Sequence, residues 1–102
     1  MRKRLEGGYK VTALEYLYAM ATRAAVRGAF AQIFTEVDLL VGATLPALPP
    51  RIDERVVHIN GVEANTVESF TRFNSPQNLA GLPSLSIPCG LAKGLPIGLQ
   101  FI

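Results

Sequence analysis

The chain has 102 residues, of which 49% are hydrophobic, and its formal net charge is +2. This length accommodates one domain at most, the composition excludes an intrinsically disordered chain, and the single cysteine excludes an internal disulfide. No apolar run approaches the 18 or so residues that span a bilayer, and no apolar stretch follows the basic N-terminus as in a signal peptide, so we expect a cytoplasmic protein.

The only charge cluster comprises Arg2, Lys3 and Arg4 at the N-terminus. Its simplest interpretation is a solvated lead-in to a helix, and a phosphate or tRNA contact is the alternative. A net charge of +2 is too small to be a nucleic-acid footprint by itself. We therefore expect neither nucleic acid nor a membrane as a partner.

Residues 12–35 are predicted to form one long helix. Thr12 and Glu15 have the spacing of a capping box, in which each side chain bonds the backbone N–H of the other residue. Helical spacing then continues for about six turns, with Gly28 as the one costly interruption. The pattern predicts an apolar, alanine-rich face packed closely against a neighbour and an opposite face that carries Arg23, Arg27 and Gln32.

Three shorter elements are predicted in the middle of the chain. Residues 37–43 form an apolar run of strand length, and the proline-rich residues 45–51 read as an extended loop. Asn60 and Gly61 follow a short apolar run and mark a hairpin turn, because both positions tolerate positive φ. Residues 65–73 are compatible with a short helix.

The C-terminal third carries the densest pattern. After a short turn or helix, the sequence Gly-Leu-Pro occurs twice, at 81–83 and 94–96, and each copy leads into an apolar run. Proline is tolerated where strand pairing begins, so these runs predict two strands, residues 85–88 and 95–102. Because neither run alternates cleanly, we expect both strands to be buried on both faces. We expect them to be joined through residues 90–94 and to share one sheet with residues 37–43.

These residues resemble the C-terminal region of the amidase signature family, which has the pattern P-x-N-L-x-G-L-P-x-x-S-x-P-C-G and then G-L-P-x-G-L-Q. The matching residues are Pro76, Asn78, Leu79, Gly81, Leu82, Pro83, Ser86, Pro88, Cys89 and Gly90, then Gly94, Leu95, Pro96, Gly98, Leu99 and Gln100. Upstream, the family's R-x-x-x-G, S/T-A-x-E/D-Y-x-x-A-x-x-x-R and D-L-L-x-x-P-T-x-P patterns align with Arg4 to Gly8, Thr12 to Arg23 and Asp38 to Pro46. Ala43 departs from the family's usual proline.

The resemblance implies an α/β fold, a fragment of the family's mixed sheet with one long N-terminal helix packed on a few strands. It also implies amide hydrolysis by a Ser–Ser–Lys triad whose lysine acts as the base and which needs no cofactor. In the family those residues lie upstream of this region. None of the four serines here has a Gly-Ser-Ser context. The resemblance thus predicts that residues 1–102 are the C-terminal part of an amidase domain, truncated at both ends, with open strand edges that favour self-association.

The candidate site residues follow from the same resemblance. Arg4 matches an arginine that binds the glutamine carboxylate in the amidotransferase branch, and Thr71 stands where that branch has an acidic partner. Asn78 is expected to satisfy backbone groups in a tight turn, with pocket lining as the alternative. These three are the substrate-pocket candidates, and no catalytic residue is expected in this chain. The structural candidates are Gly81, Pro83, Gly94 and Pro96.

Other reactive side chains receive a structural interpretation. A Ser86–Lys93 pair is rejected because a turn lysine is solvated and keeps its charge. Cys89 is expected to be a buried structural cysteine and His58 an exposed residue in a hairpin. One histidine and one cysteine cannot supply three metal ligands, so no metal site is expected.

The sequence therefore predicts the C-terminal portion of an enzyme that hydrolyses carboxylic amides, with catalytic residues outside this chain. The loss of the acid at Thr71 favours a general amidase. The alternatives are the amidase subunit of a tRNA-dependent amidotransferase and a non-catalytic remnant that associates with itself.

Overall fold

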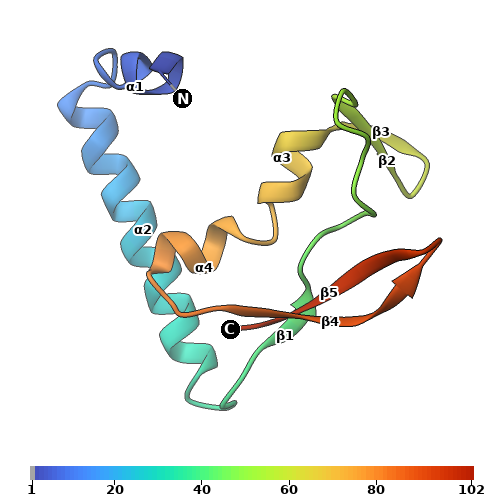
Figure 1. Cartoon of the computed structure of the whole chain (residues 1–102). Helices are drawn as coiled ribbons and strands as arrows, with labels where there is room; N and C mark the ends of the chain where they lie inside the picture. Colours follow the sequence, from blue (N-terminus) through green and yellow to red (C-terminus); the bar gives the residue numbers. More distant parts are fainter. Residues whose placement is uncertain (1) are drawn as a thin grey trace.

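The computed structural model describes the backbone of residues 2–102 and the side chains of residues 5–102. Its elements are α1 (Arg2–Gly8), α2 (Ala13–Ile33), β1 (Val41–Ala43), β2 (Val56–Ile59), β3 (Val62–Asn65), α3 (Thr66–Thr71), α4 (Ser75–Ala80), β4 (Leu85–Ala92) and β5 (Leu95–Phe101). The α/β class is confirmed. Figure 1 shows α2 on one side, the β4–β5 ribbon on the other, and α3 and α4 between them. None of the helices described over residues 2–102 has the length and apolarity of a bilayer span.

The long helix begins where the capping box predicts. Thr12 is the N-cap residue, and its hydroxyl accepts a hydrogen bond from the Glu15 N–H at 3.2 Å. In return, the Thr12 N–H and hydroxyl donate to Glu15 Oε2 at 2.7 and 2.8 Å. These bonds stabilise the charged carboxylate and lower the pKa of Glu15. The predicted start and continuity of this helix are therefore confirmed.

Replacing Thr12 with alanine is expected to lower the free energy of unfolding by about 1 kcal/mol, because the cap at the start of the helix is lost. Urea titration followed by circular dichroism measures this loss. Thr22→Ala is the control, since the Thr22 hydroxyl only bonds the Tyr18 carbonyl within the helix.

The stabilisation by the capping box should depend on pH. The folded-state pKa of Glu15 is lowered, so the contribution of the Glu15 carboxylate to stability is present at neutral pH and is lost as the pH falls through that pKa. The difference between wild type and Thr12→Ala should therefore shrink in acid.

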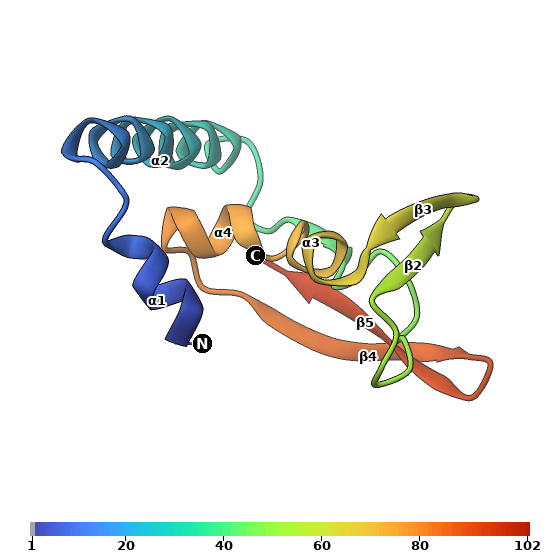
Figure 2. The ribbon, with the colours of Figure 1, turned by 90° about the horizontal axis from the view of Figure 1, so that it is seen from above.

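The side of α2 that packs differs from the prediction. The Arg23 guanidinium Nε donates to the Leu79 carbonyl of α4 at 2.9 Å, and Val26 and Phe30 are half-buried beside it. Phe30 and Phe34 of the predicted apolar face are half-buried, whereas the alanines of that face are exposed. The reason is a tertiary contact: the C-terminal carbonyls of α4 carry partial negative charge, and the Arg23 side chain satisfies one of them. The long helix thus reaches the sheet through α4 instead of packing directly on the strands (Figure 2).

The strands form two antiparallel sheets. β2 and β3 make a hairpin whose turn residues, Asn60 and Gly61, have φ of 52° and 80° as predicted. β1, β5 and β4 form the second sheet in that order, with β5 in the centre. The predicted sharing of one sheet is therefore confirmed. The β4–β5 connection is shorter than residues 90–94, because Gly90, Leu91 and Ala92 already pair with β5.

The first predicted strand is shorter than residues 37–43. The end of α2 continues as turns, in which the N–H groups of Glu36 and Val37 donate to the Ile33 carbonyl. Those bonds hold the backbone in a helical curve, so pairing with β5 begins only at Leu40, whose N–H and C=O both bond Ile102. α3 forms within residues 65–73 as expected, and the Asn65 side chain caps it by accepting from the N–H groups of Val67 and Glu68.

The prediction that β4 and β5 are buried is wrong for this chain. Among residues 5–102, the buried side chains are Val57, Gln77, Ala80 and Gln100. The accessible surface is 8387 Å², against about 5,600 Å² for a compact protein of 11.0 kDa. The radius of gyration is 16.5 Å, against about 13 Å for a compact chain of this length. The strands are exposed because the described residues supply no layer for their second face.

Candidate functional site

The strongest polar cluster lies where α4 meets the central strand. Gln77 on α4 and Gln100 on β5 are only 3% and 6% exposed. Gln77 Nε2 donates to Gln100 Oε1 at 2.9 Å and to the Phe73 carbonyl at 2.7 Å. Gln100 Nε2 donates to the same carbonyl at 3.2 Å. Because buried polar atoms are costly without partners, these bonds fix the position of α4 on the sheet.

A second set of bonds joins the same region to β1. Asn74 Nδ2 donates to the carbonyls of Phe70 and Thr44 at 3.1 and 3.4 Å. The Thr44 N–H donates to the Gly98 carbonyl at 3.0 Å, and the Thr44 and Ser86 hydroxyls share a hydrogen bond. We call Thr44, Asn74, Gln77, Ser86 and Gln100 the polar junction. Its groups bond one another and the backbone, so the arrangement positions elements and does not activate a nucleophile.

Gly98 allows the Thr44 and Ser86 hydroxyls of the polar junction to approach the backbone of β5 closely. A Cβ atom built on Gly98 would lie 2.7 Å from Thr44 Oγ1 and 2.9 Å from Ser86 Oγ. Both separations are below ordinary van der Waals contact, so only glycine fits between these hydroxyls without a shift. Gly98, the second glycine of the G-L-P-x-G-L-Q pattern, therefore has a packing role in this chain.

Of the three substrate-pocket candidates, the structure describes the side chains of Thr71 and Asn78, and no hydrogen bond joins these two. The Arg4 side chain lies outside the described residues. The Thr71 hydroxyl donates back into its own helix, to the carbonyls of Val67 and Glu68 at 2.9 and 3.2 Å. Asn78 is exposed on α4 beside a hollow that Val26 and Leu79 also line. The Asn78 side chain makes no hydrogen bond with residues 5–102. The bonds to backbone carbonyls that we expected from Asn78 come from Asn74 instead.

The structural candidates all lie at element ends. Gly81 ends α4 with φ of 76°, and the Leu82 N–H donates to the Gln77 carbonyl at 3.0 Å. That pair of features is a Schellman motif, which favours glycine at this position. Gly94 has φ of 75° in the β4–β5 turn. Pro83 precedes β4, and Pro96 is the second residue of β5, paired with Leu91.

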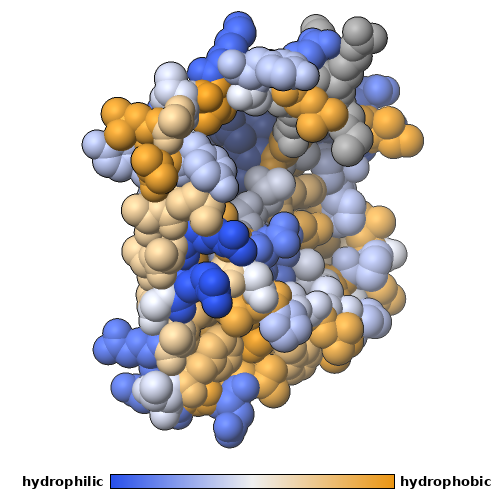
Figure 3. Space-filling view, turned by 90° about the vertical axis from the view of Figure 1, so that its left-hand side faces the viewer, coloured by the Kyte–Doolittle hydropathy of each residue, from blue (hydrophilic) through white to orange (hydrophobic). Residues whose placement is uncertain are grey.

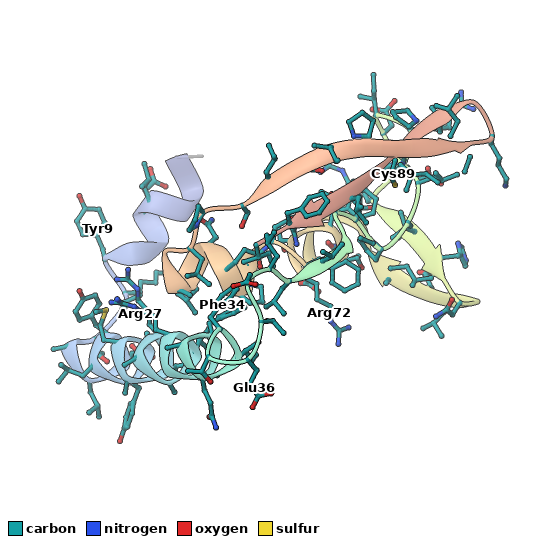
Figure 4. The ribbon with its side chains drawn as sticks, turned by 90° about the horizontal axis from the view of Figure 1, so that it is seen from below. Tyr9, Arg27, Phe34, Glu36, Arg72 and Cys89 are labelled. Carbon is teal, nitrogen blue, oxygen red and sulfur yellow. The ribbon has the colours of Figure 1, made fainter. Side chains whose placement is uncertain are left out.

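The other reactive side chains have no partners for catalysis within the described residues. Ser86 pairs with Gln100, whereas Lys93 lies in the turn at the far end of β4, about 20 Å along the strand. Cys89 is exposed rather than buried, and its thiol contacts the Ile97 carbonyl at 3.5 Å (Figure 4). His58 is exposed on β2, as predicted. No group of three metal-binding side chains occurs in the described part of the chain.

A cleft of about 710 Å³ separates the β2–β3 hairpin from α3. Its lining includes Glu63, Glu68, Arg72 and Phe73, and its volume is in the range of small-molecule sites. Arg72 extends away from the sheet (Figure 4). Neither this cleft nor the roles of Asn74 and Gln77 are indicated by the motifs of the sequence. The sequence feature that could have indicated the roles of Asn74 and Gln77 is the presence of polar residues between the apolar positions of residues 73–79.

Comparisons with known proteins agree with the resemblance. The amidase family model matches residues 1–102. The chain is 42% identical over 87 residues to a glutamyl-tRNA(Gln) amidotransferase subunit of Natranaerobius thermophilus, covering 85% of this chain and 17% of that protein. It is 39% identical over 90 residues to an amidase of Pseudomonas putida, covering 87% and 19%. An amidase crystal structure superposes with a TM-score of 0.90 at 29% identity, covering 98% of this chain and 23% of that one. The chain thus spans under a fifth of the length of these curated relatives.

Proposed function

Because this chain belongs to the amidase family, we propose that it forms the C-terminal portion of an amidase domain that hydrolyses carboxylic amides. The observation that carries the proposal is the match of the family model to the whole chain, together with the small share of each relative that the chain represents. The open surface described above supports it, because a segment that belongs to a larger domain leaves its faces uncovered.

The chemistry of this proposal divides between two parts of the domain. The Ser–Ser–Lys residues lie outside this chain, and they supply the nucleophile and its base without a cofactor. Residues 1–102 supply rigid positioning through the polar junction. Arg4, Thr71 and Asn78 are the side chains that we assign to the pocket for a small-molecule amide. Positioning of this kind matters for catalysis because small misplacements of substrate are costly in rate.

We expect the isolated chain to hydrolyse no amide, since among the described residues no nucleophilic side chain is paired with a side chain that could act as its base. The assay measures ammonia or amine release from a panel of aliphatic and aromatic amides. Its positive counterpart is a chimera, the Pseudomonas putida amidase with its matched segment replaced by this chain. The chimera is expected to retain amide hydrolysis. Turnover by the isolated chain that is lost in Ser86→Ala would contradict the proposal, as would an inactive but folded chimera.

The second candidate parent is the amidase subunit of a tRNA-dependent amidotransferase. The 42% identity to the amidotransferase subunit of Natranaerobius thermophilus favours it. Thr71 argues for the general amidase, because a neutral hydroxyl lacks the charge of the acidic partner in the amidotransferase branch. The two candidates separate when the chimera is given glutamine and simple amides in parallel: a general amidase prefers the simple amides.

A further inference from the structure

The cleft between the β2–β3 hairpin and α3 runs along the edge of a strand. All of β3, Val62–Asn65, lines this cleft, whereas Ile59 is its lining residue from β2. The opposite wall comes from Glu68 and Ser69 of α3 and from Arg72 at the C-terminal end of that helix. We call this cleft the hairpin groove. It lies between the outer edge of β3 and a helix (Figure 1).

The backbone of β3 has unpaired hydrogen-bonding groups on the side of the groove. The Thr66 N–H donates to the Arg55 carbonyl at 3.0 Å, so these two residues form a hydrogen-bonded pair. Bonded and non-bonded pairs alternate along antiparallel strands, and Glu63 opposite His58 is therefore a non-bonded pair. The Glu63 N–H and C=O groups thus point away from β2, and they have no partner among the described residues. Unpaired groups on a strand edge can pair with a further strand.

The floor of the hairpin groove is apolar. Ile59 and Val62 are paired across the hairpin, and Pro46 and Phe73 line the groove beside them. Val62 is 65% exposed and Phe73 is 40% exposed, so the floor is accessible. Every second side chain of an extended ligand points to the same side. A strand added at β3 would therefore place alternate side chains on this floor, and apolar side chains suit it.

The helical wall of the groove carries two opposite charges. Glu68 and Arg72 are four residues apart, which places them on the same side of the chain at the end of α3. Both are exposed, and neither side chain makes an ion pair or a hydrogen bond with residues 5–102. The wall therefore offers one carboxylate and one guanidinium, and a ligand with one basic and one acidic side chain is complementary to both.

Two other open surfaces lack this combination of features. The free edge of β4 contains Pro88, which has no N–H group for a ladder, and the register shifts between Pro88 and Gly90. The side of the molecule on which α2 lies has hydrophobic and hydrophilic residues side by side (Figure 3). The backbone groups of a helix bond within the helix, so that side offers a partner side chains alone. The hairpin groove offers unpaired strand groups, an apolar floor and a charged wall together.

We propose that the hairpin groove binds an extended segment of a partner protein as a third strand beside β3. One side of this segment carries apolar residues, and the other carries a basic and an acidic residue. In this mode of recognition, main-chain hydrogen bonds supply affinity, and the side chains that alternate along the strand supply specificity. No step of amide hydrolysis is assigned to the groove, so the inference does not depend on the proposed function.

The test measures binding of a synthetic peptide, acetyl-Thr-Lys-Val-Glu-Val-Thr-amide, to this chain and to the Pseudomonas putida chimera by isothermal titration calorimetry. Binding to both proteins is expected. Glu63→Pro should weaken binding at least tenfold, because proline removes the outward N–H group and is tolerated at an outward edge position. Glu63→Ala retains this N–H group and should change the affinity less than threefold. His58→Pro is the matched control, since His58 stands opposite Glu63 on the other edge of the hairpin, and it should also have an effect below threefold.

Two further measurements test the strand pairing and the charges. Two peptides are N-methylated, one at both valines and the other at lysine and glutamate. Only alternate N–H groups of an added strand face β3, so one of these peptides should bind at least tenfold more weakly than the other. This comparison uses the unaltered protein and holds even if Glu63→Pro disrupts the hairpin. The double variant Glu68→Gln with Arg72→Gln should bind the unmethylated peptide about tenfold more weakly than wild type.

Each outcome decides the inference separately from the proposed function. Absence of binding to either protein, equal affinities of the two methylated peptides, or unchanged affinity of the double variant would overturn the inference. Binding to the isolated chain but not to the chimera would overturn it as well, because the rest of the domain then occupies the groove. Protection of the Glu63 amide that rises with the concentration of the chain alone identifies a second copy as the occupant and also overturns it. An inactive chimera that binds the peptide supports the inference and counts against the proposed function.

Discussion

Replacing Gln77 with leucine is expected to lower the free energy of unfolding of this chain by about 2 kcal/mol. The substitution removes the bonds from Gln77 Nε2 to Gln100 Oε1 and to the Phe73 carbonyl. Gln100 is 6% exposed, so its Oε1 atom is left buried without a partner. A buried acceptor in that state costs about 1–3 kcal/mol, which is more than the net value of an ordinary hydrogen bond. Urea denaturation followed by circular dichroism measures the loss.

The control for Gln77 is Gln32→Leu, which makes the same chemical change at an exposed helical position and should alter stability by less than about 0.5 kcal/mol. The double variant Gln77→Leu with Gln100→Leu should lose less than the sum of the single variants, because both members of the amide pair are then apolar. Strict additivity would show that the two amides do not interact in solution.

Replacing Gly98 with alanine is expected to lower the free energy of unfolding by about 1–3 kcal/mol, the usual cost of overpacking. The added Cβ would lie 2.7 Å from Thr44 Oγ1, 2.9 Å from Ser86 Oγ and 3.0 Å from Thr44 Cβ. Thr44 must move, and its N–H then loses the Gly98 carbonyl at the junction of β1 and β5. The same denaturation experiment measures the effect, and faster hydrogen exchange at the Thr44 amide reports where it acts.

Gly42→Ala is the matched control for Gly98, because Gly42 pairs with Gln100 in the same sheet and has no atom within 4 Å of an added Cβ. Alanine there should be neutral or slightly stabilising through the unfolded state. Adding Thr44→Ala to Gly98→Ala removes the nearest oxygen and should restore part of the stability. If alanine at positions 98 and 42 has the same effect, the close approach at Gly98 is not tight in solution.

The features that the sequence determined by itself are local. The Thr12–Glu15 capping box spans four residues, and the turn at Asn60 and Gly61 depends on which residues tolerate positive φ. Such signals need no distant partner, so the sequence carries them completely. The family resemblance is also a property of the sequence, because its residues stand at fixed spacings along the chain, and the match to the amidase family model agrees with it.

Only the tertiary structure decided which surfaces meet. The periodicity of the sequence showed that α2 has an apolar face and a polar face. Arg23 lies on the packed side because it donates to the Leu79 carbonyl, which is 56 residues away in the sequence. The Gln77–Gln100 bond and the pairing of β1 with β5 likewise join residues far apart in the sequence. Apolar content indicated covered strands, yet the described residues leave one sheet face open. The apolar residues of a strand show that one of its faces favours burial. Burial itself requires a second surface that packs on this face, and the sequence of the strand does not identify that surface.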